Sequence, residues 1–330
     1  MGGPGGLALV AALAALAALV PGMALAHGGA EPRPGPATLV TGWEFDPLFL
    51  GAVAATTWAY VAGVRSIGRA HPASPFPRRR VAFFLGGMGA LVVAIASPLA
   101  AYDTTLFSAH MVQHLLIAMV AAPLLLLGMP ITLALRAASA RVRRGLLLPV
   151  LHSRAVKMLA FPVVAWVIFV LTMWVTHFSP LFNEALEDGW LHRLEHSWYL
   201  AAGLLFWWPA ITADPGPWRM NHPVRLLYLF LQMPQNSFLG TAIYSSDDVL
   251  YRHYEMLTRA WGPSALSDQQ LAGVIMWVGG DLIFLIALAL VAYGWVQHEE
   301  RRTRVDDRAR ARVTAGRLAG DSAGRGEGAS

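Results

Sequence analysis

Residues 191–211 read LHRLEHSWYLAAGLLFWWPAI, a short polar segment that runs directly into a long apolar one. In a helix, His192 and His196 lie one turn apart, about 6 Å along the axis and on the same face. Two imidazoles with this spacing can bind one metal ion. The apolar remainder is typical of a membrane helix. The stretch therefore combines a candidate metal site with a candidate membrane span.

The apolar character of this stretch extends over most of the chain. Of 330 residues, 56% are hydrophobic and 14% are charged, and the mean hydropathy is +0.49. A soluble domain carries about a quarter charged residues. We therefore expect an all-α, polytopic membrane protein with a seven-helix transmembrane bundle. The expected helices are residues 47–64, 81–98, 109–135, 158–177, 191–211, 224–244 and 270–296.

The basic residues predict the orientation of this bundle. Four of the 25, Arg33, Arg193, Arg252 and Arg259, lie on one side of the expected membrane, and the other 21 lie in the alternate loops and the C-terminal tail. Because positively charged loops stay in the cytoplasm, the N-terminus is predicted outside and the C-terminus in the cytoplasm. Topology thus accounts for the net charge of +5, and nucleic acid is not an expected partner.

The chain before the seven-helix domain (47–297) divides into two parts. Residues 7–26 are rich in Ala and Leu and end in Ala24-Leu25-Ala26, which predicts that residues 1–26 are a cleavable signal peptide. The first six residues lack the positive charge that usually precedes such a segment, so an uncleaved helix is the alternative. Residues 27–46, rich in Gly and Pro, predict an extracytoplasmic linker.

The chain after the seven-helix domain is a charged segment. Residues 298–330 mix Arg, Asp, Glu and Gly and contain few apolar side chains to bury. Such a composition favours disorder. We expect a cytoplasmic tail that is mostly disordered after a short helical extension.

Five histidines fall at the outer ends of three expected helices. His110 and His114 begin the third helix, His177 ends the fourth, and His192 and His196 begin the fifth. A single histidine at a membrane interface is often only an amphipathic side chain. Five at the same depth predict a metal site, provided that the three helices are neighbours, because imidazole is the commonest metal ligand.

Thioethers and carboxylates accompany these histidines. Met111 and Met173 lie on the same helices, and Asp103 and Glu195 lie nearby in the sequence. The chain has no cysteine, so a metal site must use His, Met, carboxylates or backbone groups. Histidine with methionine suits copper, and zinc is the alternative. Haem is disfavoured because it needs a deep slot between helices, whereas these histidines are expected near the outer surface.

Two polar features are expected deeper in the bundle. Asp281 lies near the middle of the seventh helix, where an ionisable side chain is a candidate for a proton or metal path. The sixth helix carries Gln232, Gln235 and Asn236. A hydrogen bond from one of these amides to Asp281 is the structural alternative.

The histidine pair also invites an enzymatic interpretation. Residues 192–196 match H-x-x-E-H, a metalloprotease motif in which the glutamate is the general base. That motif belongs on a helix of a soluble αβ domain, for which this chain has no room. A membrane zinc hydrolase in which Glu195 activates water remains the main alternative. A scaffold or permease whose histidines bind no metal is a third.

Three stretches of the sequence resemble a known family. They are HMVQHLL at 110–116 with APL at 122–124, WLHRLEH at 190–196 with GLLFWWP at 203–209, and DQQLAG at 268–273 with MW at 276–277. With these motifs the chain resembles the bacterial multi-spanning cytochrome c oxidase assembly proteins of the CtaG type. The similarity extends over residues 45–297.

The resemblance implies a protein of the bacterial inner membrane that helps to mature a haem–copper terminal oxidase. It implies copper as the metal and oxidase subunits as partners, with a periplasmic copper carrier as a candidate source. We expect an assembly factor rather than an enzyme, with no catalytic residues. Because metal exchange favours an open coordination sphere, the site is expected to be accessible at the outer helix ends.

The residues expected to serve this site fall into two groups. The principal copper ligands are expected to be His110, His114, His192 and His196, and the additional ligands His177, Met111 and Met173. Glu195 is expected to orient an imidazole, because a metal-bound histidine usually donates its other N–H to an acceptor. Asp103 and Asp281 are assigned to second-shell support or to the transfer path.

Overall fold

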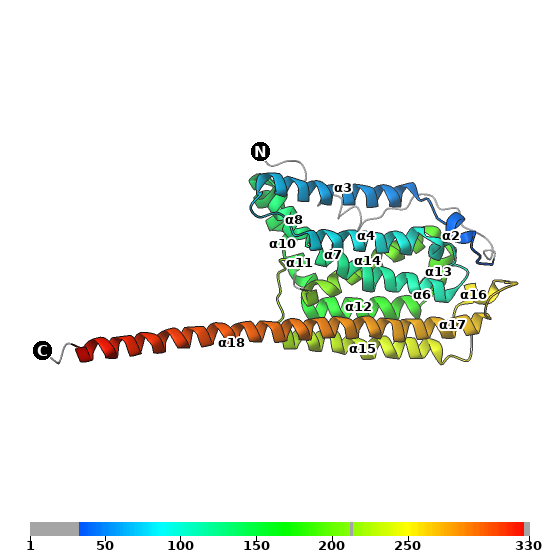
Figure 1. Ribbon diagram of the computed structural model, residues 1–330. Helices are drawn as coiled ribbons and strands as arrows, with labels where there is room; N and C mark the ends of the chain where they lie inside the picture. Colours follow the sequence, from blue (N-terminus) through cyan, green and yellow to red (C-terminus); the bar gives the residue numbers. More distant parts are fainter. Residues whose placement is uncertain (1–32, 212–213, 327–330) are drawn as a thin grey trace.

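Long antiparallel helices form a bundle in the computed structural model, which describes residues 33–211 and 214–326 (Figure 1). Every regular element in this part of the chain is helical. Residues 1–32, with the expected signal peptide and the start of the linker, lie outside it. The long helices are α3 (Pro47–Ala70), α4 (Arg78–Ala96), α12 (Pro162–His177), α14 (Gly189–Ile211), α15 (His222–Tyr244) and α18 (Gly280–Gly326).

Two further long helices are each interrupted by a π-helical segment. The first is α6 (Phe107–Leu115), η1 (Leu116–Ala121) and α7 (Ala122–Leu127). The second is α17 (Ala265–Val274) and η3 (Ile275–Gly279), which continue into α18. The short elements are α2 (Thr38–Thr41), α5 (Pro98–Ala101), α8 (Pro130–Ala137), α9 (Ala140–Val142), η2 (Arg143–Leu147), α10 (Leu148–Leu151), α11 (Arg154–Leu159), α13 (Leu181–Glu187) and α16 (Arg252–Met256).

Proline explains where the helices depart from the expected ranges. The range 109–135 breaks between α7 and α8 at Met129, whose φ of 54° is left-handed, and Pro130 begins the next helix. The range 158–177 breaks at Phe161, which is extended before Pro162. A residue before proline is disfavoured in the helical conformation. The remaining five expected ranges each lie in or over a helix.

Four helical stretches of the described chain are long and apolar enough to cross a membrane. They are Pro47–Ala70, Arg78–Ala101, Phe107–Ala137 and Ala265–Arg304. A fifth is present if α12 and α13, which are bent by 69°, form one span. Helices α14 and α15 carry more polar side chains. The count of seven spans and the orientation of the termini therefore stay predictions.

The two ends of the bundle differ in the loops that they carry. Residues 97–106, 178–188 and 245–264 connect the helices at one end, which we call the histidine end. Residues 71–77 and 138–161 lie at the other, which we call the arginine end. Figure 1 shows α13, α16 and the start of α17 at the histidine end. Each successive long helix therefore begins at the end where its predecessor stops.

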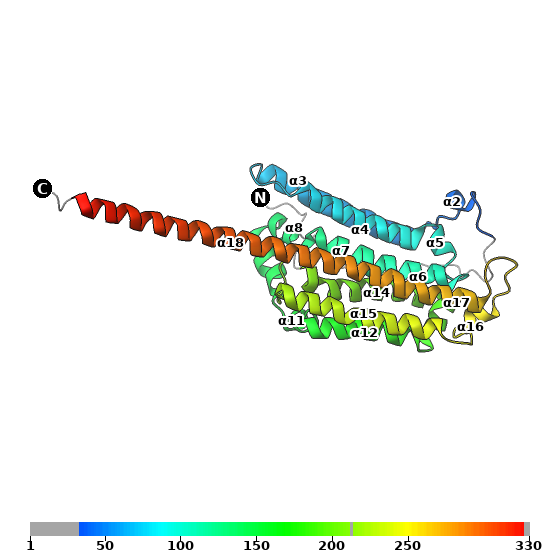
Figure 2. The same cartoon turned by 60° about the horizontal axis from the view of Figure 1, so that its bottom comes forward.

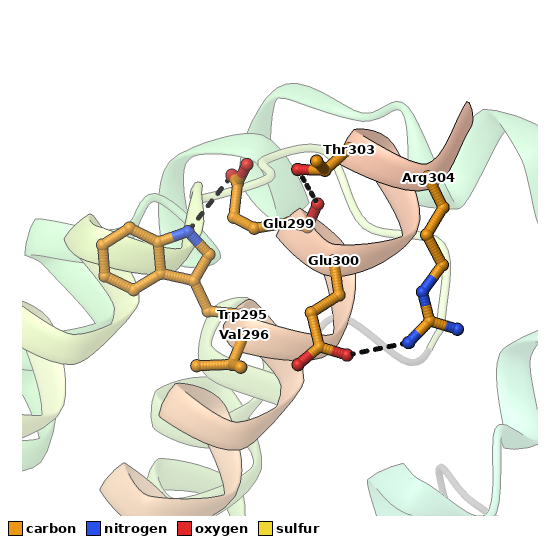
Figure 3. A pocket seen from close by; sticks show the side chains of 6 residues that line it. All are labelled: Trp295, Val296, Glu299, Glu300, Thr303 and Arg304. Atoms are coloured by element: carbon orange, nitrogen blue, oxygen red, sulfur yellow. Dashed lines mark hydrogen bonds and ion pairs between the residues drawn. The ribbon is translucent and has the colours of Figure 1, made fainter. Parts of the chain in front are cut away.

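The last helix is longer than expected. α18 continues to Gly326 and projects beyond the other helices in both views (Figures 1 and 2). The segment expected to be mostly disordered is helical over this range. Its Ala, Arg and Glu residues are strong helix formers. Pairs one turn apart add support: Arg304 lies 3.4 Å from Glu300, and Trp295 donates to Glu299 at 3.4 Å (Figure 3).

Helices α15 and α17 approach each other closely at a pair of glycines. A Cβ on Gly273 would lie 2.7 Å from the carbonyl oxygen of Gly240 and 2.9 Å from the backbone nitrogen of Tyr244. A Cβ on Gly240 would lie 2.8 Å from the carbonyl oxygen of Gly273. Backbone atoms cannot yield as a flexible side chain can. The glycines therefore fix the spacing of the two helices.

We predict that Gly273→Ala lowers stability although alanine is the better helix former. The added methyl group must push α15 and α17 apart, and overpacking of this kind costs about 1–3 kcal/mol. The matched control is Gly89→Ala in α4, where no atom lies within 4 Å of the added Cβ. Thermal unfolding in detergent should show a lower Tm for Gly273→Ala only. Equal Tm values would contradict the close approach.

Candidate metal centre

The three helices that carry the five histidines meet at the histidine end. The ring centroids of His110 and His192 lie 5.4 Å apart, those of His114 and His196 6.1 Å, and those of His114 and His177 6.3 Å. The expectation that these helices are neighbours is thereby confirmed. We call these residues the five-histidine cluster.

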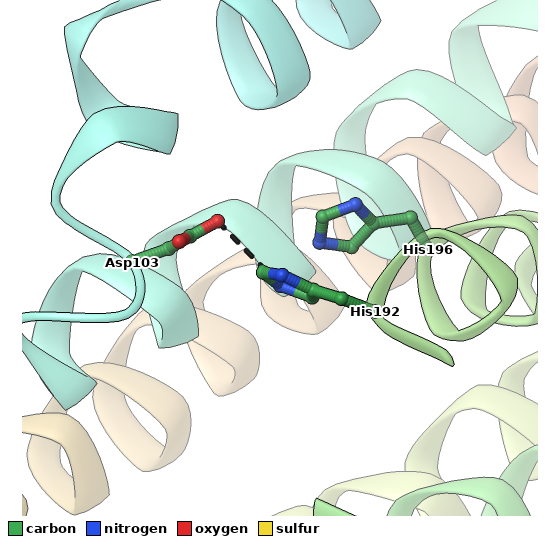
Figure 4. A group of neighbouring side chains, drawn as sticks. All are labelled: Asp103, His192 and His196. Atoms are coloured by element: carbon green, nitrogen blue, oxygen red, sulfur yellow. Dashed lines mark ion pairs between the residues drawn. The ribbon is translucent and has the colours of Figure 1, made fainter. Parts of the chain in front are cut away.

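Two carboxylates approach the cluster to ligand distance. Asp103, His192 and His196 each offer a ligand atom within 4.8 Å of the other two (Figure 4). The same holds for His110, His192 and Glu195. The Oδ2 atom of Asp103 lies 3.5 Å from Nε2 of His192. A metal ion could thus contact Asp103 and Glu195 directly, whereas the sequence suggested only indirect support.

Several ring nitrogens of the cluster lack hydrogen-bond partners. Both nitrogens of His110 and of His114 are buried without a partner, as is Nε2 of His177 and of His192. An unsatisfied buried polar group costs about 1–3 kcal/mol. A bound metal ion would satisfy several such nitrogens at once. The donor set therefore fits a metal that prefers imidazole.

In two of the rings, hydrogen bonds determine which nitrogen keeps a lone pair for a metal ion. Nδ1 of His177 donates to the backbone carbonyl of Met173 at 2.7 Å, which leaves the lone pair on Nε2. The amide of Gln113 donates to the carbonyl of Ala94 at 2.9 Å, so its oxygen accepts from Nε2 of His196 at 2.9 Å. The lone pair of His196 is then on Nδ1. Such orientation is typical of metal-ligating histidines.

Loops of the histidine end cover the cluster. Tyr254 donates its hydroxyl to the carbonyl of Asp103 at 2.6 Å, and Nε2 of His253 donates to the carbonyl of Thr104 at 2.8 Å. His110 is fully buried, and the side chain of His192 is 12% exposed. The expectation of an accessible site at the helix ends was wrong, because residues 245–264 fold over it. His192 and Asp103 form its outermost part.

The electrostatic surroundings of Asp103 reflect this cover. Burial raises the pKa of Asp103, which lies in the loop before α6, to about 7. Desolvation disfavours the charged carboxylate, whereas a cation close to it favours that form. A metal ion beside Asp103 would therefore stabilise the carboxylate.

A buried aspartate fixes the start of the helix that carries His110. The carboxylate of Asp268 accepts from the backbone N–H of Phe107 at 2.7 Å and from the hydroxyl of Ser108 at 2.5 Å. Nη1 of Arg259 lies 3.9 Å from the same carboxylate. These contacts join α17 to the first turn of α6. Asp268 therefore positions the histidines of α6.

The remaining predicted residues divide between two places. Met111 and Met173 line a small cavity beside the cluster. Asp281 lies apart from the cluster, where it accepts from the amide of Asn236 at 3.1 Å and from the hydroxyl of Ser237 at 2.6 Å. This pairing confirms the structural alternative for Asp281.

Sequence reasoning missed two residues of the site, Gln113 and Asp268. Both lie inside motifs that carry the family resemblance, and both are polar side chains next to apolar runs. Buried polar groups of this kind require partners within the protein. That requirement could have identified the two residues as structurally important. Their partners cannot be predicted from it, because they depend on how the helices pack.

Comparison with known proteins agrees with this architecture. The fold and the cluster define an all-helical protein with several helices of membrane length. The sequence profile of the cytochrome c oxidase caa3 assembly factor family matches residues 58–298, and the chain belongs to this family. The matched range includes the whole five-histidine cluster. No solved structure matches the chain.

Two curated relatives are longer proteins. An uncharacterized protein of Mycobacterium bovis is 33% identical over 279 residues, which is 82% of this chain and 42% of the relative. An uncharacterized protein of Mycobacterium leprae is 31% identical over 275 residues, which is 81% of this chain and 41% of the relative. The chain thus spans about two fifths of the length of these relatives.

We predict that Gln113→Met weakens metal binding. The variant removes the acceptor that fixes the orientation of His196, and losing such a partner costs about 10–100-fold in metal affinity. Gln270→Met, on the partly exposed face of α17, is the control. Titration of both purified variants with Cu(II) should separate them. Equal affinities would show that the hydrogen bond does not orient a ligand.

Proposed function

We propose that this protein binds copper in the five-histidine cluster and delivers it to a subunit of a haem–copper cytochrome c oxidase. One observation carries the proposal: five imidazoles from α6, α12 and α14 converge, and four of the five rings keep a buried nitrogen that makes no hydrogen bond. Membership of an oxidase assembly family supplies the cellular context.

The ligand chemistry favours copper over zinc. Imidazole accepts both metals, but thioethers favour copper in its monovalent state. Met111 and Met173 lie beside His114 and His177 at the same small cavity. The absence of cysteine leaves methionine as the sulfur ligand of this chain. Copper is therefore the metal for which the combined donor set is best suited.

The direction of delivery follows from the proposed topology. We place the protein in the bacterial inner membrane with seven spans, the histidine end outside and the arginine end in the cytoplasm. The distribution of basic residues supports this orientation. Copper would then arrive from the periplasm, with a periplasmic copper carrier as its source, and leave to an oxidase subunit. The residues that it would meet first are Asp103 and His192.

The zinc hydrolase has no comparable support. Glu195 is 8% exposed and lies 3.9 Å from ring nitrogens of both His110 and His114. A general base for hydrolysis needs room for a water molecule and a substrate beside it. A carboxylate enclosed by imidazoles is better placed to bind the metal than to activate water. The family to which the chain belongs is described as an oxidase assembly factor, which supports the assembly role.

We predict that the purified protein holds at least one equivalent of copper and that His192→Ala with His196→Ala loses it. Both substitutions in this double variant remove ligand atoms that lie close to Asp103 or Glu195. The matched control is His71→Ala with His152→Ala, two exposed histidines at the arginine end. Metal analysis by mass spectrometry should show the loss only in the cluster variant. Zinc in place of copper, with turnover of a lipid or peptide, would overturn the proposal.

We predict further that deletion of the gene lowers the activity of the oxidase and that added copper partly restores it. Excess copper can bypass a delivery factor by loading the oxidase directly. Complementation with the wild-type chain and with the two double variants links this result to the cluster. Normal oxidase activity with normal copper content after deletion would rule out the delivery role.

A further inference from the structure

A small cavity continues inward from the five-histidine cluster. Four methionines line it, and two histidines of the cluster border it. The methionines come from three separate helical stretches, so the cavity lies between them rather than along one helix. The methionines and histidines that line the cavity are Met111, Met119, Met173, Met276, His114 and His177.

The helices are irregular where they supply two of these methionines. Met119 lies in η1 and Met276 lies in η3. Single turns of π-helix inside α-helices are frequent at functional sites, because the extra residue redirects side chains. Two such turns face the same cavity from α6–α7 and from α17–α18. Both methionines are buried, at 5% and 2% exposed.

The histidines present unpartnered atoms to this cavity. Nε2 of His177 and both ring nitrogens of His114 are buried without a hydrogen bond. The hydrogen bond to Met173 places the proton of His177 on Nδ1, so Nε2 carries a lone pair. No carboxylate is among the residues that line the cavity. Four thioethers and two imidazoles are therefore its main candidate ligands, beside the amide of Asn236 and the hydroxyl of Tyr199.

We propose that this cavity is a second metal site, selective for monovalent copper, and deeper than the outer group of Asp103, His110, His192, His196 and Glu195. Soft thioether ligands select Cu(I), whereas carboxylates suit harder cations. This inference rests on the proposed function in copper delivery and adds a second copper site to it. Met119 and Met276, which the family motifs did not mark as ligands, become ligands here.

His114 connects the two sites. Its ring centroid lies 4.2 Å from that of His110 in the outer group and 6.3 Å from that of His177 at the cavity. A copper ion that enters beside His192 can therefore pass between ligands without crossing an apolar gap. The inner site would hold Cu(I) away from water and oxygen, below the carboxylates.

The test uses the full-length protein in detergent, loaded anaerobically with Cu(I), with Ag(I) as a redox-inert analogue or with Zn(II). X-ray absorption at the copper edge should show sulfur scattering in the wild type. Met119→Leu with Met276→Leu removes two of the four thioethers, so it should clearly lower that signal and weaken Ag(I) binding. Zn(II) binding should stay unchanged, because its ligands lie in the outer group.

The control is Met88→Leu, a buried methionine of α4 that does not line the cavity. Both leucine variants should unfold at similar temperatures, since leucine has nearly the volume of methionine. If the double variant does not fold, the X-ray absorption spectrum of the Cu(I)-loaded wild type is the test. Absence of sulfur scattering in that spectrum would overturn the inner site.

The outcomes separate this inference from the proposed function. Unchanged Ag(I) binding and sulfur scattering in the double methionine variant would make these residues core packing only. Copper loss in His192→Ala with His196→Ala would then still support the delivery role. If neither Cu(I) nor Ag(I) binds the wild-type protein, both the inner site and the copper function fail.

Discussion

Polar side chains inside an apolar bundle must find their partners within the protein, because lipid offers no hydrogen bonds. Gln113 and Asp268 satisfy this constraint with two hydrogen bonds each, and they join helices in doing so. Most histidines of the cluster do not satisfy it, because four of the five rings keep buried nitrogens without hydrogen-bond partners. The same constraint that fixes the framework therefore makes the cluster stand out as a ligand set.

The helices followed from the sequence because hydrophobic runs and proline positions are local signals. Five of the seven expected ranges matched helices, and the breaks at Met129 and Phe161 in the other two follow from the prolines after them. The length of α18 was harder to predict. Composition of the tail favoured disorder, whereas its helix propensity and charge pairs favoured the helix that the structure shows.

The candidate site was only partly predictable for a different reason. Topology alone placed five histidines at one depth, and the structure confirms that they meet. Burial was missed because the cover comes from residues 245–264, far away in the sequence. The place of Met119 and Met276 at the cavity could not be predicted, because π-turns shift the face on which later residues lie and a regular helical period does not reveal such a shift.

The cover over the cluster also has a kinetic consequence. The hydrogen bonds of Tyr254 and His253 hold residues 245–264 against the backbone of Asp103 and Thr104. An ion bound beside Asp103 would leave when this loop opens, so its residence time would depend on a local opening reaction as well as on ligand strength. A partner protein that docks on the loop and holds it open would accelerate release without changing a single ligand. The recipient protein would then control when the ion is released.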